Sequence, residues 1–131
     1  MRSWIIFLVL FVWGIQVSAK QITQTEARNV AINWLNQFNA NVLSFDAIQS
    51  VQTITDNKTP LIFLVNFKSK GWVLVSATDE VEPVLGYSLS TNFDINNMPV
   101  QLNEWVNGLK SEIKFSLRED YQPDVQLPEK W

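Results

Sequence analysis

Apolar residues recur with a helical period near the start of the chain. After residue 22 they return at intervals of three and four positions, a spacing that favours one buried stripe on a helix. The stripe consists of Ala27, Val30, Ala31, Trp34, Leu35 and Phe38. Thr23 precedes it and Glu26 follows three positions later, which is the capping-box pattern of a helix start. The sequence therefore predicts an amphipathic helix that begins near Thr23, ends at residues 39–41 and buries Trp34 and Phe38.

Short apolar runs follow this helix and predict strands. Residues 61–67 and 72–75 are rich in β-branched and aromatic side chains and are too short for typical helices. A less regular run covers residues 45–54, where Ile48 and Val51 fall on opposite parities and indicate a bulge. Residues 56–58 and 68–71 have turn compositions, and Pro83 opens a short strand at 84–87. We expect three to four antiparallel strands, with Trp72 in the core.

A second helical stripe comes after these strands. It consists of Leu102, Trp105, Val106, Leu109 and Ile113. The sequence before it predicts an ordinary helix start, with Asn97 as the cap and Pro99 in the first turn. The expected fold class is α+β: a small antiparallel sheet of three to four strands, with an N-terminal and a C-terminal helix packed on one face. Residues 116–131 include Pro123 and Pro128, show no period, and are expected to form an extended, mobile tail.

The first residues have the pattern of a secretory signal. Arg2 gives a positive start, Trp4 to Trp13 is an unbroken apolar run, and small residues end at Ala19. The alternative is a membrane anchor, but a spanning helix needs about 20 apolar residues. We expect a signal peptide at residues 1–19, a domain at 20–115 and the tail at 116–131. The mature protein would be secreted or periplasmic, and free of the membrane after cleavage.

The composition excludes several classes of chemistry. The chain has no cysteine and no histidine, which removes Ser-His-Asp and Cys-His catalysis, disulfides, and zinc sites built on sulfur or imidazole. Ten basic residues stand against 13 acidic residues, so no basic stripe favours nucleic acid as a partner. The composition therefore favours a domain that binds over one that reacts, with no cofactor.

Two groups of acidic residues are candidates for chemical sites. Asp79, Glu80 and Glu82 lie in a turn beside a proline, where clustered charges usually form a solvated loop. Glu119, Asp120 and Asp124 lack the central glycine and closing glutamate of a calcium loop. Neither group predicts an enzyme or a metal site.

One stretch resembles a known family. Residues 71–88 read GWVLVSATDEVEPVLGYS, which is similar to the pro-domain of streptopain-like cysteine peptidases and to the free Spi-type protease inhibitors. Those domains share the pattern of a glycine, an aromatic residue and V-x-V-S-A-x-D, followed by P-V-L-G-Y-S. Phe93 and Asp94, the apolar residues of the second helix, and Ala27, Ala31, Trp34 and Leu35 of the first helix also match. The resemblance covers residues 23 to 115, nearly all of the expected domain.

The resemblance implies a non-enzymatic inhibitor whose partner is a streptopain-like cysteine peptidase. In the family, an asparagine just before the first apolar residue of the second helix enters the peptidase cleft. That position is occupied here by Gln101, and Asn103 is a possible substitute. The expected peptidase contacts are Asn97, Met98, Pro99, Gln101 and Asn103. Two further hypotheses stay open: an orphan pro-domain that assists folding of a separately encoded peptidase, and a secreted binding module similar to PepSY domains.

The signal-peptide hypothesis gives the first testable prediction. We expect the exported protein to begin at Lys20, because small residues precede the expected cleavage position after Ala19. Intact-mass measurement of protein from the culture medium or periplasm checks this. A mature protein that retains Trp4 to Trp13 would contradict it.

Overall fold

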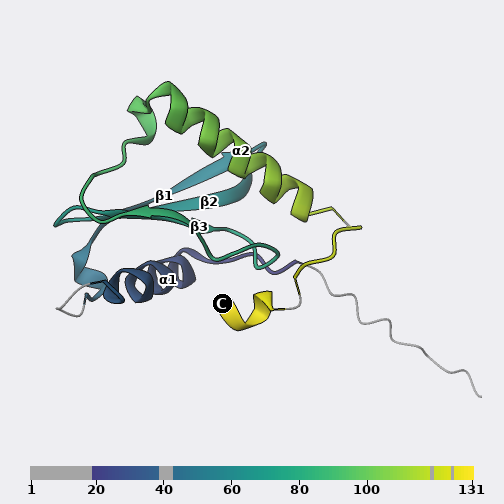
Figure 1. Cartoon of the computed structure of the whole chain (residues 1–131), viewed down its shortest axis with the longest axis horizontal. Helices are drawn as coiled ribbons and strands as arrows, with labels where there is room; N and C mark the ends of the chain where they lie inside the picture. Colours follow the sequence, from purple (N-terminus) through teal and green to yellow (C-terminus); the bar gives the residue numbers. More distant parts are fainter. Residues whose placement is uncertain (1–18, 39–42, 119, 125) are drawn as a thin grey trace, which may run out of the picture.

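A four-stranded antiparallel sheet lies between two helices in the computed structural model, which describes residues 19–38, 43–118, 120–124 and 126–131 (Figure 1). The strands are β1 (Ile48–Asp56), β2 (Thr59–Phe67), β3 (Trp72–Ser76) and β4 (Val84–Ser88), in the spatial order β1-β2-β3-β4. The helices are α1 (Gln24–Asn36) and α2 (Val100–Ser116), with short 3-10 turns η1 (Phe45–Ala47), η2 (Ile95–Asn97) and η3 (Leu127–Lys130). The predicted α+β class is confirmed.

The two helices cover opposite faces of the sheet, with α2 above it and α1 below it (Figure 1). The prediction that both pack on one face was wrong. One core lies between the sheet and α1 and includes Phe63, Val65, Phe67, Val73 and Val75. The other lies on the α2 side and includes Ile62, Leu64, Trp72 and Leu74. Two-sided burial explains why the central strands are continuous apolar runs without alternation.

Helix α1 begins as the capping box predicts. The Thr23 hydroxyl accepts a hydrogen bond from the Glu26 N–H (3.2 Å), and the Thr23 N–H donates to the Glu26 carboxylate (2.8 Å). The helix ends at Asn36, so Phe38 lies beyond it and is 47% exposed. The predicted burial of Phe38 was therefore wrong, and Trp34 is only half-buried. The predicted helix end at 39–41 falls outside the described residues.

The strand predictions are confirmed with one correction. Residues 45–47 form η1 and not the start of a strand, while the expected irregularity in β1 appears as two register shifts. Asn57 (φ 47°) and Lys58 (φ 69°) both adopt left-handed backbone conformations in the tight β1–β2 hairpin. At the β2–β3 hairpin, Lys70 (φ 90°) and Gly71 (φ 102°) do the same. Trp72 is buried, as predicted.

The end of the chain is not an extended tail. Residues 127–130 form η3 on the same side of the sheet as α1 (Figure 1). Leu127 is only 4% exposed, and the Trp131 indole N–H donates to the carbonyl of Val81 (3.1 Å). Lys130 forms an ion pair with Glu82. The apolar side chains of this segment, which carry no period in the sequence, are thus docked by tertiary contacts.

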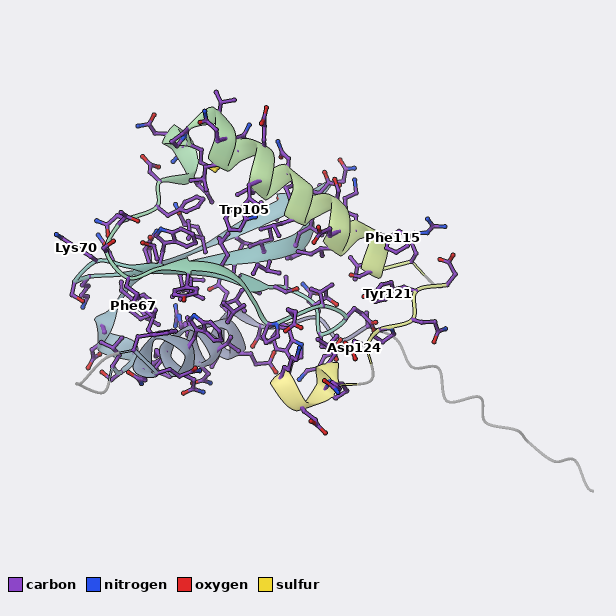
Figure 2. The ribbon with its side chains drawn as sticks, in the orientation of Figure 1. Phe67, Lys70, Trp105, Phe115, Tyr121 and Asp124 are labelled. Atoms are coloured by element: carbon purple, nitrogen blue, oxygen red, sulfur yellow. The ribbon has the colours of Figure 1, made fainter. Side chains whose placement is uncertain are left out.

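Trp105 and Gly86 fix the position of α2 over β4. Trp105 extends from α2 toward the sheet (Figure 2). A Cβ atom added at Gly86 would lie 2.9 Å from Cζ2 of the Trp105 ring and closer still to Cη2. The glycine therefore leaves the space that the indole ring occupies. At Gly108, which lies in α2, a Cβ atom would have no neighbour within 4 Å apart from the adjacent residues and the local helix backbone.

These two glycines give a matched pair of predictions. We expect Gly86→Ala to destabilise the fold by about 1–3 kcal/mol, because a rigid ring must move to admit the methyl group. Gly108→Ala should instead stabilise it by about 0.5–1 kcal/mol, because alanine is the better residue inside a helix. Urea unfolding of both variants measures the two effects. Equal stability of Gly86→Ala and wild type would show that Trp105 does not fill this space in solution.

The capping box predicts a pH-dependent contribution to stability. Hydrogen bonds from the Lys20 ammonium and the Thr23 N–H hold the pKa of Glu26 below its ordinary value of 4.5. A lowered pKa in the folded state means that the stabilisation is present above pH 4.5 and is lost as the pH falls through the folded value. Glu26→Gln keeps an acceptor for the Thr23 N–H but removes the charge.

We therefore expect the free energy of unfolding of Glu26→Gln to approach that of wild type as the pH falls below 4.5. Thr23→Ala should cost about 1 kcal/mol at neutral pH, because the Glu26 N–H loses its partner. Urea unfolding between pH 3 and 7 checks both. A difference between wild type and Glu26→Gln that stays constant over this range would contradict the pKa argument.

Candidate functional site

The connection from the sheet to α2 is a short, structured segment. Asp94 precedes η2, and its carboxylate accepts a hydrogen bond from the Asn96 N–H (2.9 Å). The Asn97 N–H donates to the Asp94 carbonyl (3.3 Å). Phe93 is buried, and its main chain exchanges hydrogen bonds with the side chain of Asn66 in β2. The segment is therefore tied to the sheet before it reaches the helix.

The start of α2 differs from the predicted helix start. Pro99 is the N-cap and lies just before the first turn, and no side chain caps the helix. Asn97 therefore does not have the capping role that the sequence predicts. The first helical hydrogen bond runs from the Asn103 N–H to the Pro99 carbonyl (3.0 Å). Without side-chain capping, this end of α2 presents main-chain N–H groups that a partner can use.

The five predicted contact residues do not lie on one surface. Met98 is half-buried against the core on the α2 side, where it anchors the segment, while Asn97, Pro99, Gln101 and Asn103 are exposed. Positions two apart on a helix point about 200° apart around its axis. Gln101 and Asn103 therefore project from different sides of α2.

The neighbours of these two residues confirm this division. Gln101 lies four positions before Trp105 and so shares the side of α2 that covers Gly86. Asn103 lines a small cavity of about 200 Å³ together with Met98 and residues of β1, among them Thr53. Gln101 is thus on the side of α2 that carries Trp105, and Asn103 is on the side that faces β1.

The acidic turn before β4 holds other segments of the chain. The Asp79 carboxylate accepts a hydrogen bond from the Lys20 N–H (2.8 Å), and Glu82 pairs with Lys130. Burial, with a smaller effect from the Asp79 charge, raises the pKa of Glu80.

In the described ranges no three Asp or Glu side chains gather closely enough to hold a metal ion. The same ranges contain no helix that is long and apolar enough to cross a bilayer.

The sequence did not reveal a groove beside β4. It has a volume of about 550 Å³ and lies between α1, the residues that lead into β4, and the end of the chain. Its walls include Val30, Trp34, Pro83, Val84 and Trp131. Trp34 also makes an edge-to-face contact with Tyr87, with ring centroids 5.4 Å apart. Only the helical stripe hinted at Trp34, and the docking of Trp131 has no local sequence signal.

Comparison with known proteins identifies the family. The family model described as Spi protease inhibitor matches residues 19–113, which include the whole sheet and nearly all of α2. The chain belongs to the Spi protease inhibitor family. It is also similar to the thiol protease/hemagglutinin PrtT of Porphyromonas gingivalis, with 28% identity over 101 residues. That match covers 74% of this chain but only 12% of the relative's length. No solved structure matches.

Membership of the Spi family confirms the resemblance that residues 71–88 carry. The family's motif here forms β3, the acidic turn and β4. Within that motif, Gly86 is the residue that admits the Trp105 ring. The Spi-family motif therefore also positions α2, and with it the residues from 97 to 103.

Proposed function

We propose that this protein is a secreted or periplasmic inhibitor of a streptopain-like cysteine peptidase, and that it blocks the active-site cleft. The match to the Spi inhibitor family over residues 19–113 carries the proposal, since it covers both the sheet and the α2 segment. The similarity to a thiol protease supports a cysteine peptidase as the target class. The chain contributes no catalytic group and acts by binding alone.

Cleavage of the signal peptide after Ala19 is compatible with the contacts that Lys20 makes. Signal cleavage after Ala19 would leave Lys20 as the first residue. The Lys20 backbone nitrogen lies 2.8 Å from the Asp79 carboxylate. Cleavage would convert the neutral N–H donor of this hydrogen bond into a charged amino group and so form an ion pair. The family match begins at residue 19, which leaves all but the last residue of the expected signal peptide outside it.

Inhibition would proceed by occlusion. A rigid sheet and a well-anchored α2 present Gln101 and the exposed residues around it to the cleft. The Gln101 amide can both donate and accept hydrogen bonds, as the asparagine at this position does in the family. A cleft-blocking contact of standard size would bury roughly 1,600 Å² in total.

A folding assistant is the second candidate function. The relative PrtT favours this function, because the matched region is a small part of a longer chain that is itself named as a thiol protease. An inhibitor lowers the rate of the active enzyme in a titration, whereas a folding assistant raises the yield of active enzyme from the denatured chain. Both assays with the streptopain-like peptidase of the same organism separate the two.

Gln101 gives the direct test of the inhibitory contact. We expect Gln101→Ala to weaken inhibition by about 1–3 kcal/mol, because buried polar groups of the peptidase lose their partner. Gln101→Asn should preserve or improve inhibition, because it restores the family's residue. Asn103→Ala is the matched control: it removes an exposed amide from the β1 side of α2 and should leave the inhibition constant unchanged.

The measurements are the inhibition constants of the three variants and their melting temperatures. Both positions are exposed, so the melting temperatures should stay close to that of wild type. Equal inhibition by Gln101→Ala and wild type would remove Gln101 as the key contact. A selective loss with Asn103→Ala would move the contact to the β1 side of α2.

A further inference from the structure

The outer edge of β4 has main-chain groups without a strand partner. Within the described residues, β4 is the last strand of the sheet and pairs with β3 alone. The Phe67 N–H of β2 donates to the Gly71 carbonyl (3.0 Å), which sets the alternation of hydrogen bonds along β3. The main-chain N–H and C=O groups of odd-numbered residues in β3 therefore hydrogen-bond to β2, and those of even-numbered residues hydrogen-bond to β4. The Ser76 N–H follows this rule, since it donates to the Pro83 carbonyl (3.0 Å).

The alternation shows which residues of β4 face outward. Tyr87 and Val84 lie opposite Val73 and Val75, whose main-chain groups bond to β2. Tyr87 and Val84 therefore direct their N–H and C=O groups away from β3. Residues 83–91 contain no charged side chain, so this edge lacks the lysines that protect many strand edges from pairing.

Exposed aromatic rings flank the edge on both faces of the sheet. On the α1 face, Tyr87 (41% exposed) stacks on Phe38, with ring centroids 5.4 Å apart. On the α2 face, Trp105 (39% exposed) covers Gly86. The 550 Å³ groove opens on the α1 face and is lined by Val84 itself. An unpaired edge beside a groove is the arrangement that binds an extended peptide as an added strand.

We propose that the β4 edge binds an extended, uncharged segment of the target peptidase as a fifth strand. The main chain of that segment would hydrogen-bond to Tyr87 and Val84, and one of its apolar side chains would enter the groove. This inference rests on the proposed function, because it names a second contact of the same complex.

Continuity of the surface favours the peptidase over a second copy of this chain. Gln101, the proposed cleft contact, lies one helical turn from Trp105. Trp105 in turn packs on Gly86, in the middle of β4. One partner can therefore reach Gln101 and the outer edge of β4 together.

Amide hydrogen exchange by NMR tests the proposal without a mutation. The probe is the streptopain-like peptidase of the same organism with its catalytic cysteine replaced by alanine, added to the isotope-labelled mature protein. In the free protein, the Tyr87 and Val84 amides should exchange fast, whereas Gly86 and Ser88 should be protected by β3. In the complex, the Tyr87 and Val84 amides should slow by at least about tenfold. Thr53 of β1 lies opposite Phe63, whose main-chain groups bond to β3, so the Thr53 amide faces outward on the opposite edge and should stay fast.

Paired substitutions give an independent measurement. Tyr87→Val and Tyr87→Pro both remove the ring, but only proline removes the outward N–H. We expect Tyr87→Pro to inhibit about tenfold more weakly than Tyr87→Val, the cost of about one interfacial hydrogen bond. Thr53→Pro makes the same change on the β1 edge and should inhibit as wild type does. Melting temperatures show which variants are folded. If Tyr87→Pro does not fold, the hydrogen-exchange experiment on the wild-type protein decides whether the added strand forms.

The outcomes separate the two levels of the hypothesis. Wild-type protein that fails to inhibit the active enzyme would overturn the proposed function itself. Inhibition in a complex whose Tyr87 and Val84 amides still exchange fast would overturn only the added strand. Protection that appears without the peptidase and rises with protein concentration would also overturn it and would assign the edge to a second copy.

Discussion

Burial of the central strands on both faces is the constraint on which the rest of the structure depends. Val65 and Val73 on one face and Leu64 and Leu74 on the other are fully buried, so β2 and β3 need a cover on each side. A chain without disulfides has to supply those covers from its own helices. α1 covers one face and α2 the other, which leaves the outer strands β1 and β4 as the edges of the sheet. This arrangement also sets the place of the candidate site. After β4 the chain has to continue onto the face of the sheet opposite α1, and the candidate site lies where this connection meets the start of α2.

The contact between Trp105 and Gly86 turns this architecture into a binding surface. The indole ring occupies the space of a side chain on β4, so Trp105 of α2 packs directly on the middle of that strand. Met98 and Phe93 anchor the connection from the core side, while Gln101 remains exposed. A segment that is fixed at both ends loses little conformational entropy when it enters a cleft, which favours tight inhibition by a group that does no chemistry.

The acidic turn before β4 joins both ends of the described chain. Asp79 binds the Lys20 N–H, Glu82 pairs with Lys130, and the Val81 carbonyl accepts from the Trp131 indole. Gln21 and Thr78 add a bridge between the first residues and this turn. The charges that resemble a catalytic cluster in the sequence are therefore structural. They also shape the groove beside β4, because Trp131 forms one of its walls.

The sequence by itself determined the elements whose causes are local. The capping box at Thr23 and Glu26, the hairpin turns at 57–58 and 70–71, and the helical stripe after Pro99 each depend on neighbouring residues, so periodicity and turn chemistry could predict them. Only the tertiary structure decided that the helices lie on opposite faces, since a continuous apolar run does not state which element covers which side. The same holds for Phe38, exposed because α1 ends at Asn36, and for Trp131, docked by contacts about 50 residues away along the chain. For the candidate site, the family resemblance located the region from 97 to 103, and helix geometry separates Gln101 from Asn103. Which strand each of them faces depends on how α2 is rotated against the sheet. The stripe predicts which face of α2 is buried, but only the tertiary structure shows that Trp105 of this face lies on Gly86 of β4.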